Sequence, residues 1–267
     1  MIVVLRPGLL TTVQDEGRPG LAHLGVPHAG AADLAAYARA NRRVGNRPGA
    51  AALELTAVGP QLRFEVDATV AVHDRVRFVP AGSVLDVGPV TQGVRSYLAV
   101  RGGLDVAPVL GSRSTCTLSG LGPRPLREGD RLAIGRDVEG EPSRDDAADP
   151  ELRGAPLRLL LGPRDDALTE AGWRALLTQA WTVTPASDRT GLRLDGEPLQ
   201  RAGNAELASE GLVVGAVQVP PDGRPVLFLA NHPTAGGYPV VAVVVRADLA
   251  RAAQAAPGDV LRFAVRA

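Results

Sequence analysis

The sequence contains no lysine, so all 29 of its basic side chains are arginines. This absence excludes a Schiff-base lysine, the lysine of a phosphate-binding P-loop and a lysine that carries biotin. Met1 is the only methionine, so the Met-Lys-Met signature of a biotin carrier is absent as well. We expect no covalent biotin on this chain, and any biotin would have to arrive on another chain.

Cysteine and long apolar runs are also scarce. Cys116 is the single cysteine, which excludes an internal disulfide and a zinc site built from several thiolates. Residues 1–7 lack the charged and apolar regions of a signal peptide, and no run reaches the roughly 18 apolar residues of a membrane span. We therefore expect a cytoplasmic protein with no membrane partner, and we assign no metal site.

Neither sign of charge is in excess, because 29 Asp and Glu residues balance the arginines. No field of the whole chain then attracts a polyanion, so we do not expect nucleic acid as a partner. The length of 267 residues gives room for two domains, each with a core of its own.

Glycine and proline are abundant, with 31 and 22 residues, and they interrupt the sequence every few positions. Such punctuation favours short strands over long helices, so the sequence predicts a mainly β fold with a few short helices. Helices are predicted over 31–44, 169–179 and 248–254. Strands are predicted over 62–66, 69–72, 95–100, 157–161, 215–219, 226–230, 240–245 and 260–265.

A polar and acidic stretch divides the chain into a first lobe over 1–140, a linker or surface loop over 141–155 and a second lobe over 156–267. Both lobes end alike, with Gly129-Asp130 and Gly258-Asp259 leading into a closing strand. We interpret the lobes as related β-barrels. The alternative is that common turn chemistry produces the similarity.

In the first lobe, strand periodicity places Thr12 and Gln14 on one face and Asp15 on the other. A β-hairpin in which Asp15 binds turn N–H groups explains this stretch equally well. Glu54 lies in an otherwise apolar strand. Because a buried carboxylate is costly without partners, Glu54 requires water, an arginine or a ligand.

A second group in this lobe follows the strand that ends at Val100. Arg101 opens a double-glycine turn, and Ser112 and Ser114 flank Arg113 a few residues later. A guanidinium group matches carboxylate and phosphate in a bidentate manner, and hydroxyl groups complete such a site. The competing interpretation is an arginine that holds a loop by its backbone carbonyls.

In the second lobe, Asp188 and Arg189 stand next to a glycine, and Gln218 lies at the end of a strand. This pairing of charges is compatible with a ligand site or with a structural turn.

The loop over 231–239 is the most unusual segment, because it lies between two strongly apolar strands. Gly236 and Gly237 permit positive φ and a close approach of backbone N–H groups to a ligand, and prolines restrict both flanks. Thr234 and Tyr238 add hydroxyl groups. We interpret this loop as a binding loop.

Seven segments, in this order, resemble the biotin-dependent carboxyltransferase-like family, which includes the C subunit of 5-oxoprolinase, allophanate hydrolase subunit 2 and KipA. The resemblance runs from about Val3 to Phe263. The segments that carry it are 6–15, 53–56, 100–105, 109–115, 187–189, 209–211 and 233–239.

The resemblance implies two cyclophilin-like β-barrel lobes and the large subunit of an ATP-dependent amide or lactam hydrolase. The implied reaction is the opening of 5-oxoproline to glutamate with ATP and Mg²⁺. The implied partner is a smaller, KipI-like B subunit in a heterodimer or heterotetramer, and an A subunit completes the system. We expect the chain to be inactive alone.

On this hypothesis the catalytic residues are Glu54, Asp15, Arg113 and Thr234. Two departures from the family pattern affect the site: Ala235 replaces a second threonine, and the segment after Val72 is short. The residues expected to bind substrate or nucleotide are Thr12, Gln14, Arg101, Ser112, Ser114, Asp188, Arg189, Gln218, Gly236, Gly237 and Tyr238.

Two alternatives stay open. The chain could be a KipA-like regulatory protein that binds a KipI-like kinase inhibitor, or a carboxyltransferase subunit that uses carboxybiotin on a separate carrier.

Overall fold

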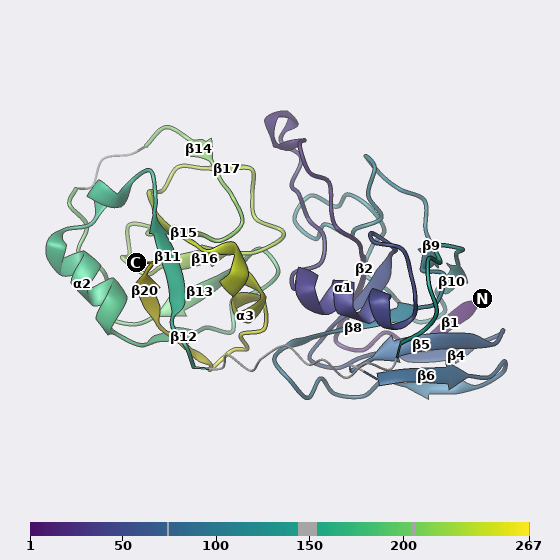
Figure 1. Cartoon of the computed structure of the whole chain (residues 1–267). Helices are drawn as coiled ribbons and strands as arrows, with labels where there is room; N and C mark the ends of the chain where they lie inside the picture. Colours follow the sequence, from purple (N-terminus) through teal and green to yellow (C-terminus); the bar gives the residue numbers. More distant parts are fainter. Residues whose placement is uncertain (74, 144–153, 204–206, 267) are drawn as a thin grey trace. The chain divides into compact units, whose positions relative to one another are not determined.

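The computed structural model describes residues 1–73, 75–143, 154–203 and 207–266. These residues form mostly short strands with three short α-helices, which confirms the predicted mainly β class. The chain divides into two compact units, which we describe one at a time (Figure 1). Unit 1 comprises Met1–Pro19 and Ala29–Pro150, and unit 2 comprises Gly20–His28 and Glu151–Ala267. Most of the predicted linker over 141–155 lies outside the described residues.

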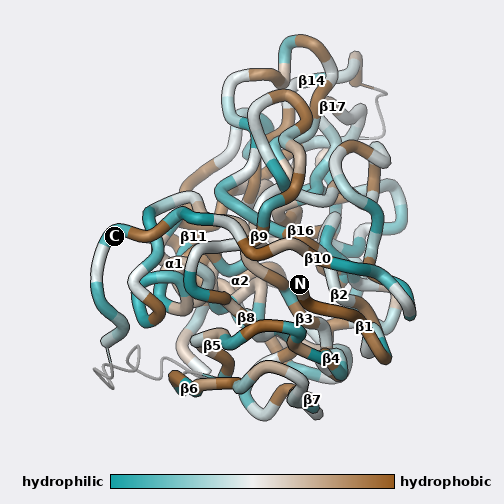
Figure 2. The backbone as a smooth tube through the Cα atoms, turned by 90° about the vertical axis from the view of Figure 1, so that its right-hand side faces the viewer, coloured by the Kyte–Doolittle hydropathy of each residue, from teal (hydrophilic) through white to brown (hydrophobic). Residues whose placement is uncertain are grey.

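Unit 1 contains two antiparallel five-stranded sheets. Their inward-facing residues form one apolar core, to which the hydrophobic strand β1 contributes (brown in Figure 2). The first sheet has the order β2 (Leu10–Gln14), β3 (Ala52–Thr56), β8 (Arg95–Val100), β5 (Ala68–Val72), β6 (Arg75–Val79). The second has the order β7 (Val84–Asp86), β4 (Gln61–Phe64), β1 (Ile2–Arg6), β10 (Arg131–Ile134), β9 (Leu104–Asp105).

Helix α1 (Leu34–Arg43) covers part of the outer face of the first sheet. Its buried Tyr37 packs in one apolar cluster with Ala52 of β3 and Tyr97 of β8. The helix begins at Asp33, whose carboxylate accepts a hydrogen bond from Ala36 N at 2.9 Å. The strands of this sheet therefore bury the barrel core on one face and a helix on the other.

The short segment after Val72 is a tight turn between β5 and β6. Val72 pairs with Arg75, which leaves two residues for the connection. His73 adopts a left-handed backbone with φ of 48°.

Unit 2 is built on one eight-stranded sheet around an apolar core that includes Trp181. Only β11 and β20 pair in parallel among the described strands. Its helices are α2 (Glu170–Thr178) and α3 (Leu249–Ala253), and β14 (Glu210–Gly211) pairs with β17 (Ala235–Gly236) beside the main sheet. The sheet order is β19 (Val260–Leu261), β12 (Trp181–Val183), β13 (Gly191–Asp195), β16 (Val226–Phe228), β15 (Ala216–Gln218), β18 (Val240–Val244), β11 (Leu157–Leu161), β20 (Phe263–Val265).

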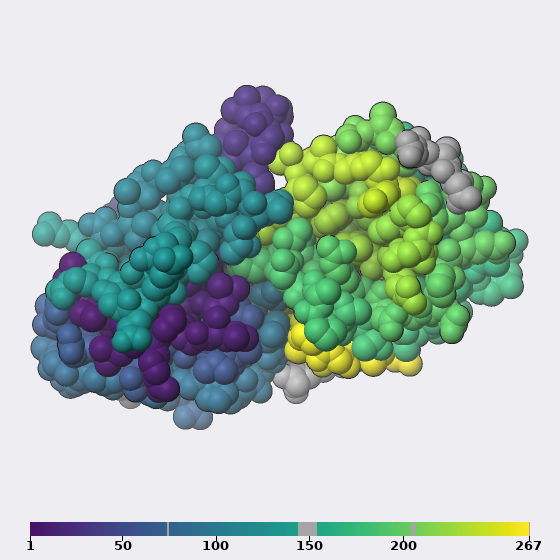
Figure 3. All heavy atoms as spheres, turned by 180° about the vertical axis from the view of Figure 1, so that it is seen from behind, coloured from purple at the N-terminus to yellow at the C-terminus, as the bar shows by residue number. Residues whose placement is uncertain are grey.

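Three single-turn 3₁₀ helices complete the described elements. η1 (Ala22–Leu24) lies in the segment Gly20–His28, which groups with unit 2 by its contacts. Residues from this early part of the chain form a projection in the space-filling view (purple in Figure 3). η2 (Asp165–Ala167) precedes α2, and η3 (Arg246–Asp248) precedes α3.

The turn that closes each unit is the same. Asp130 accepts a hydrogen bond from Arg127 N, and Asp259 accepts one from Ala256 N, both at 2.8 Å. The strand after each turn pairs antiparallel with an early strand of its own unit, β10 with β1 and β19 with β12. The similarity of the two Gly-Asp segments in the sequence therefore has a structural counterpart.

Candidate functional site

A row of polar side chains crosses the first sheet of unit 1. The strand register places Thr12 of β2 opposite Glu54 of β3, and Glu54 opposite Tyr97 of β8. Their side chains lie on the face opposite the barrel core, because residues that alternate with them, such as Leu53, belong to that core. All three are at most 3% exposed.

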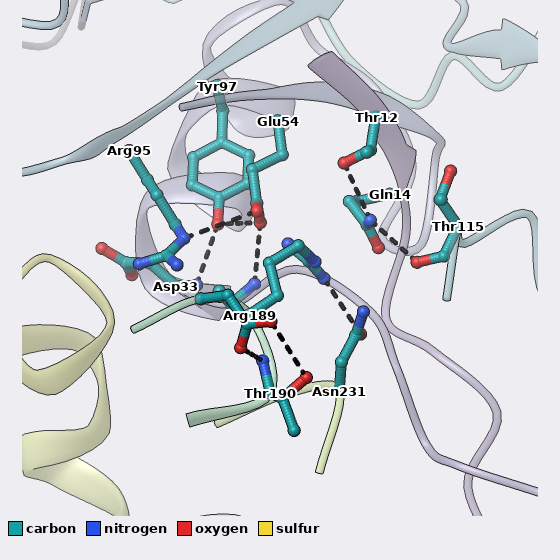
Figure 4. Close-up of polar contacts among 12 residues, drawn as sticks. Thr12, Gln14, Asp33, Glu54, Arg95, Tyr97, Thr115, Arg189, Thr190 and Asn231 are labelled. Atoms are coloured by element: carbon teal, nitrogen blue, oxygen red, sulfur yellow. Dashed lines mark hydrogen bonds and ion pairs between the residues drawn. The ribbon is translucent and has the colours of Figure 1, made fainter. Parts of the chain in front are cut away.

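Glu54 holds the centre of this row (Figure 4). Its Oε2 accepts hydrogen bonds from the Tyr97 hydroxyl at 2.7 Å and from Ala32 N at 2.9 Å, and its Oε1 lies 3.7 Å from Arg95 Nε. The Tyr97 oxygen in turn accepts from Asp33 N at 2.8 Å. Burial raises the pKa of Tyr97, so its hydroxyl stays protonated and donates. Of the three partners considered for a buried Glu54, namely water, an arginine or a ligand, the structure places an arginine, Arg95, beside it.

Gln14 lies on the same face as Thr12, two residues farther along β2. Its Nε2 donates to Thr12 Oγ1 at 3.0 Å and to the carbonyl oxygen of Thr115 at 3.1 Å. These two bonds fix the orientation of the carboxamide, which Figure 4 shows beside Thr115.

The carboxylate of Asp15 accepts hydrogen bonds from both predicted serine hydroxyl groups, those of Ser112 and Ser114. Its Oδ1 accepts from Gly17 N at 2.8 Å, Ser112 Oγ at 2.6 Å and Ser114 Oγ at 2.5 Å. Its Oδ2 accepts from Arg113 N at 2.5 Å. The carboxylate thus fixes the loop that contains Arg113 to the end of β2, and the Gly17 bond is the predicted turn contact.

Arg18 supports the same loop from within. It is 2% exposed and donates to the carbonyl oxygens of Val109 at 3.1 Å and Ser114 at 2.6 Å. Burial lowers the pKa of this guanidinium, and the nearby Asp15 raises it. Arg18 is therefore a buried part of this loop and is not solvated.

Two arginines predicted to bind anions are engaged with backbone. Arg101 Nη1 donates to the carbonyl oxygens of Val44 at 2.9 Å and Gly140 at 2.7 Å. Arg113 Nε donates to the carbonyl oxygen of Val106 at 2.8 Å. Across the described ranges, no three His, Cys, Asp or Glu side chains are grouped as metal ligands. Arg101 and Arg113 therefore do not form a binding site for Mg²⁺-ATP, and we assign neither of them a contact with it.

In unit 2, the neighbouring Asp188 and Arg189 have different surroundings. Asp188 is exposed, and its Oδ1 accepts from Thr190 N at 2.7 Å, as in a structural turn. Arg189 is 2% exposed, and its Nη2 lies 3.4 Å from Asn231 Oδ1 (Figure 4). Burial lowers the pKa of Arg189 to about 9, so this guanidinium is still charged at neutral pH.

The loop over 231–239 is held by Gln218, whose Nε2 donates to the carbonyl oxygen of Tyr238 at 2.9 Å. Neither Gly236 nor Gly237 has a positive φ, so the loop does not use the left-handed backbone that glycine permits. A Cβ at Gly236 would lie 2.9 Å from Gln218 Nε2, so a larger residue there would require the Gln218 side chain to shift. The carbonyl oxygen of Thr234 accepts a hydrogen bond from Leu212 N at 2.9 Å, which ties the loop to the residue after β14.

A family model described as carboxyltransferase domain, subdomains A and B, matches residues 24–265. The chain belongs to this family. The resemblance inferred from the seven segments is thereby confirmed. This carboxyltransferase-family chain is 37% identical to the C subunit of 5-oxoprolinase from Escherichia coli K12, over 98% of its own length and 90% of that protein.

Solved structures agree with this assignment. TTHA0988 superposes with a TM-score of 0.89 at 36% identity, covering 98% of this chain and 55% of its own. The K. lactis urea amidolyase superposes with a TM-score of 0.92 at 31% identity, covering 100% of this chain and 19% of its own. The carboxyltransferase-family chain thus spans about half the length of the first and about a fifth of the second.

The structure brings the predicted residues of this carboxyltransferase-family chain into separate groups. In unit 1, Thr12, Gln14 and Glu54 share one sheet face, whereas Asp15 and its serines form a loop anchor. Sequence reasoning did not assign site roles to four residues that the geometry places in these groups. They are Tyr97, Arg95, Thr115 and Asn231.

Proposed function

We propose that this chain is the C subunit of a 5-oxoprolinase, an ATP-dependent enzyme that opens a lactam ring. The observation that carries the proposal is the match to the C subunit of the E. coli 5-oxoprolinase over 98% of this chain and 90% of that protein. A match of this extent leaves no large part of either chain without a counterpart.

The chemistry gives the buried row a role. A lactam resists hydrolysis because its nitrogen is a poor leaving group, so the enzyme has to activate the carbonyl and protonate the nitrogen. We assign proton transfer to Glu54, whose carboxylate is kept in place by Tyr97 and Ala32 N. ATP with Mg²⁺ supplies the activation in the complete enzyme, and we place no phosphate contact on Arg101 or Arg113.

The other predicted residues have two proposed roles, which are to hold a loop of unit 1 and to form a binding surface in unit 2. We propose that Asp15 acts through the loop that it holds, with Ser112, Ser114 and Arg113 N as its donors. A second candidate surface in unit 2 consists of Thr234, Gly236, Gly237 and Tyr238. We propose that it binds substrate or nucleotide.

The word subunit in the relative's name leads us to propose partners. A smaller, KipI-like B subunit forms a hetero-oligomer with this chain, an A subunit completes the enzyme, and this chain alone has no turnover. The proposed location is the cytoplasm; among the described helices, none has the length and apolar character needed to cross a bilayer.

The test is reconstitution with the A and B subunits of the same organism. We expect ATP hydrolysis that depends on 5-oxoproline and yields glutamate, and we expect its loss when any one subunit is omitted. Glu54→Gln should lower kcat by about 100-fold or more, as for a lost general acid or base. Glu170→Gln, an exposed change in α2, is the control. Absence of turnover with all three subunits would refute the proposal.

A second candidate rests on the superposition with the urea amidolyase, at a TM-score of 0.92. In this alternative the chain transfers a carboxyl group from carboxybiotin on a separate carrier to a small amide. Biotin-dependent carboxylation of urea, with no use of 5-oxoproline, would support it. Tight binding of a KipI-like protein without substrate-dependent ATP use would instead support the regulatory alternative.

A further inference from the structure

Gln14 has one side-chain atom without a partner. Its side chain is fully buried, and its Nε2 makes two hydrogen bonds, one of them to the carbonyl oxygen of Thr115. A carbonyl only accepts hydrogen bonds, so the nitrogen has to face Thr115 and the amide cannot be reversed. Within the described residues, Gln14 Oε1 receives no hydrogen bond.

A buried carbonyl oxygen without a donor is costly, and folded proteins rarely leave one without a reason. Thr115 Oγ1, next to the Gln14 contact, is also a buried atom without a partner among the described residues. A group outside the described residues, either a ligand or an ordered water, is needed to complete the hydrogen bonds of Gln14 Oε1.

The Gln14 side chain lies on the sheet face opposite the barrel core. β2 is the edge strand of its sheet, and Gln14 shares its outer face with Thr12, which lies opposite Glu54. Its neighbour Val13, on the other face, belongs to the core. The unpartnered oxygen is thus on the same sheet face as the carboxylate to which we assign proton transfer.

We propose that Gln14 Oε1 accepts a hydrogen bond from the ring N–H of a bound cyclic amide and so determines specificity for an unsubstituted nitrogen. A neutral amide oxygen, fixed by its own N–H groups, is complementary to a neutral N–H donor. A five-membered lactam and a cyclic urea share this donor, and the test separates them. The inference rests on the proposed function for its choice of the lactam.

The experiment compares ligands that differ only at the ring nitrogen. Binding of 5-oxoproline and of its lactone analogue, in which oxygen replaces N–H, is measured by calorimetry on the complex of this chain with its partner subunits. We expect the wild type to prefer the lactam by about tenfold or more, since the lactone leaves Gln14 Oε1 without a donor. The same comparison uses 2-imidazolidinone and ethylene carbonate as the cyclic urea pair.

Variants then test whether the preference for the lactam over the lactone depends on Gln14. Gln14→Met removes the acceptor oxygen and should reduce the lactam-to-lactone ratio to about one. Gln179→Met is the matched control, because Gln179 already bonds Glu197 through both its oxygen, at 3.0 Å, and its nitrogen, at 3.1 Å. That control should keep the wild-type ratio.

The outcomes separate the two proposals. Turnover of 5-oxoproline with equal binding of lactam and lactone by the wild type would overturn the role of Gln14 and leave the function standing; the oxygen would then bond only an ordered water. If only the cyclic urea pair is discriminated, and Gln14→Met abolishes this, the role of Gln14 stands while the 5-oxoprolinase function fails. If Gln14→Met does not fold, the wild-type ratios still decide, because equal binding of lactam and lactone by the wild type overturns the role of Gln14.

Discussion

Tyr97 shows how one hydroxyl group connects two parts of unit 1. It donates to Glu54 Oε2 and accepts from Asp33 N, next to the start of α1. Removing it leaves a buried carboxylate oxygen with one donor fewer and a buried N–H without its acceptor. We therefore expect Tyr97→Phe to lower the free energy of unfolding by about 1–3 kcal/mol, measured by urea denaturation.

The control for this change is Tyr238→Phe, because Tyr238 is 48% exposed and solvent can replace what its hydroxyl loses. Its free energy of unfolding should change by less than about 0.5 kcal/mol. If the two variants lose equal stability, the bonds of Tyr97 to Glu54 and Asp33 do not have the importance that their geometry indicates.

For single residues, strand periodicity correctly predicted that Thr12 and Gln14 share a face. The cost of burying a carboxylate correctly predicted that Glu54 needs a partner. Neither argument identified Arg95 or Tyr97 as those partners, because the pairing of β3 with β8 joins positions about 40 residues apart. Cross-strand register of this kind depends on the whole sheet and cannot be obtained from local spacing.

At the scale of elements, the closing turns of the two units permit a direct comparison. Asp259 accepts from Ala256 N at 2.8 Å, whereas Asp130 in unit 1 accepts from Arg127 N and also from both Nη atoms of Arg124, at 2.7 and 2.8 Å. Asp259→Ala should therefore lower the free energy of unfolding by about 1 kcal/mol through loss of the turn bond.

Asp259→Asn is the informative companion, because its amide oxygen can still accept from Ala256 N. Urea denaturation should show that it retains most of the wild-type stability. An equal loss in both Asp259 variants would mean that charge, rather than the turn hydrogen bond, is what the carboxylate contributes.

Strand prediction succeeded where apolar runs are bounded by turns, as for β11 over Leu157–Leu161. The predicted strand over 260–265 is instead two strands, because β19 pairs with β12 while β20 pairs with β11. Leu160 and Leu161 of β11 are nevertheless 46% and 57% exposed. Apolar composition indicates a strand but does not determine what covers it.

For the molecule as a whole, stability in acid depends on carboxylates that the fold keeps charged. In unit 1, hydrogen bonds from Arg124 lower the pKa of Asp130. In unit 2, burial by itself raises the pKa of Asp248, but hydrogen bonds from the side chain and backbone of Arg158, and from Arg251, outweigh it and lower the value to about 2. Each unit thus contains a carboxylate that resists protonation while folded.

The sign of the effect follows from the difference between folded and unfolded chain. The pKa of Asp248 is 3.8 when unfolded and about 2 when folded, so its contribution is fully present above pH 4 and is lost as the pH falls toward 2. That difference corresponds to about 2 kcal/mol. Asp248→Asn should therefore cost about 2 kcal/mol at pH 7, with a deficit that narrows as the pH falls below 4.

The measurement is urea denaturation of wild type and variant between pH 7 and pH 3. Asp195→Asn is the matched control, because the ion pair of Asp195 with Arg224 is 59% and 48% exposed and water screens it. This variant should follow the wild-type curve within about 0.5 kcal/mol at every pH. A deficit of Asp248→Asn that stays constant down to pH 3 would show that the carboxylate acts through packing, since a charged pair has to lose its contribution when it is protonated.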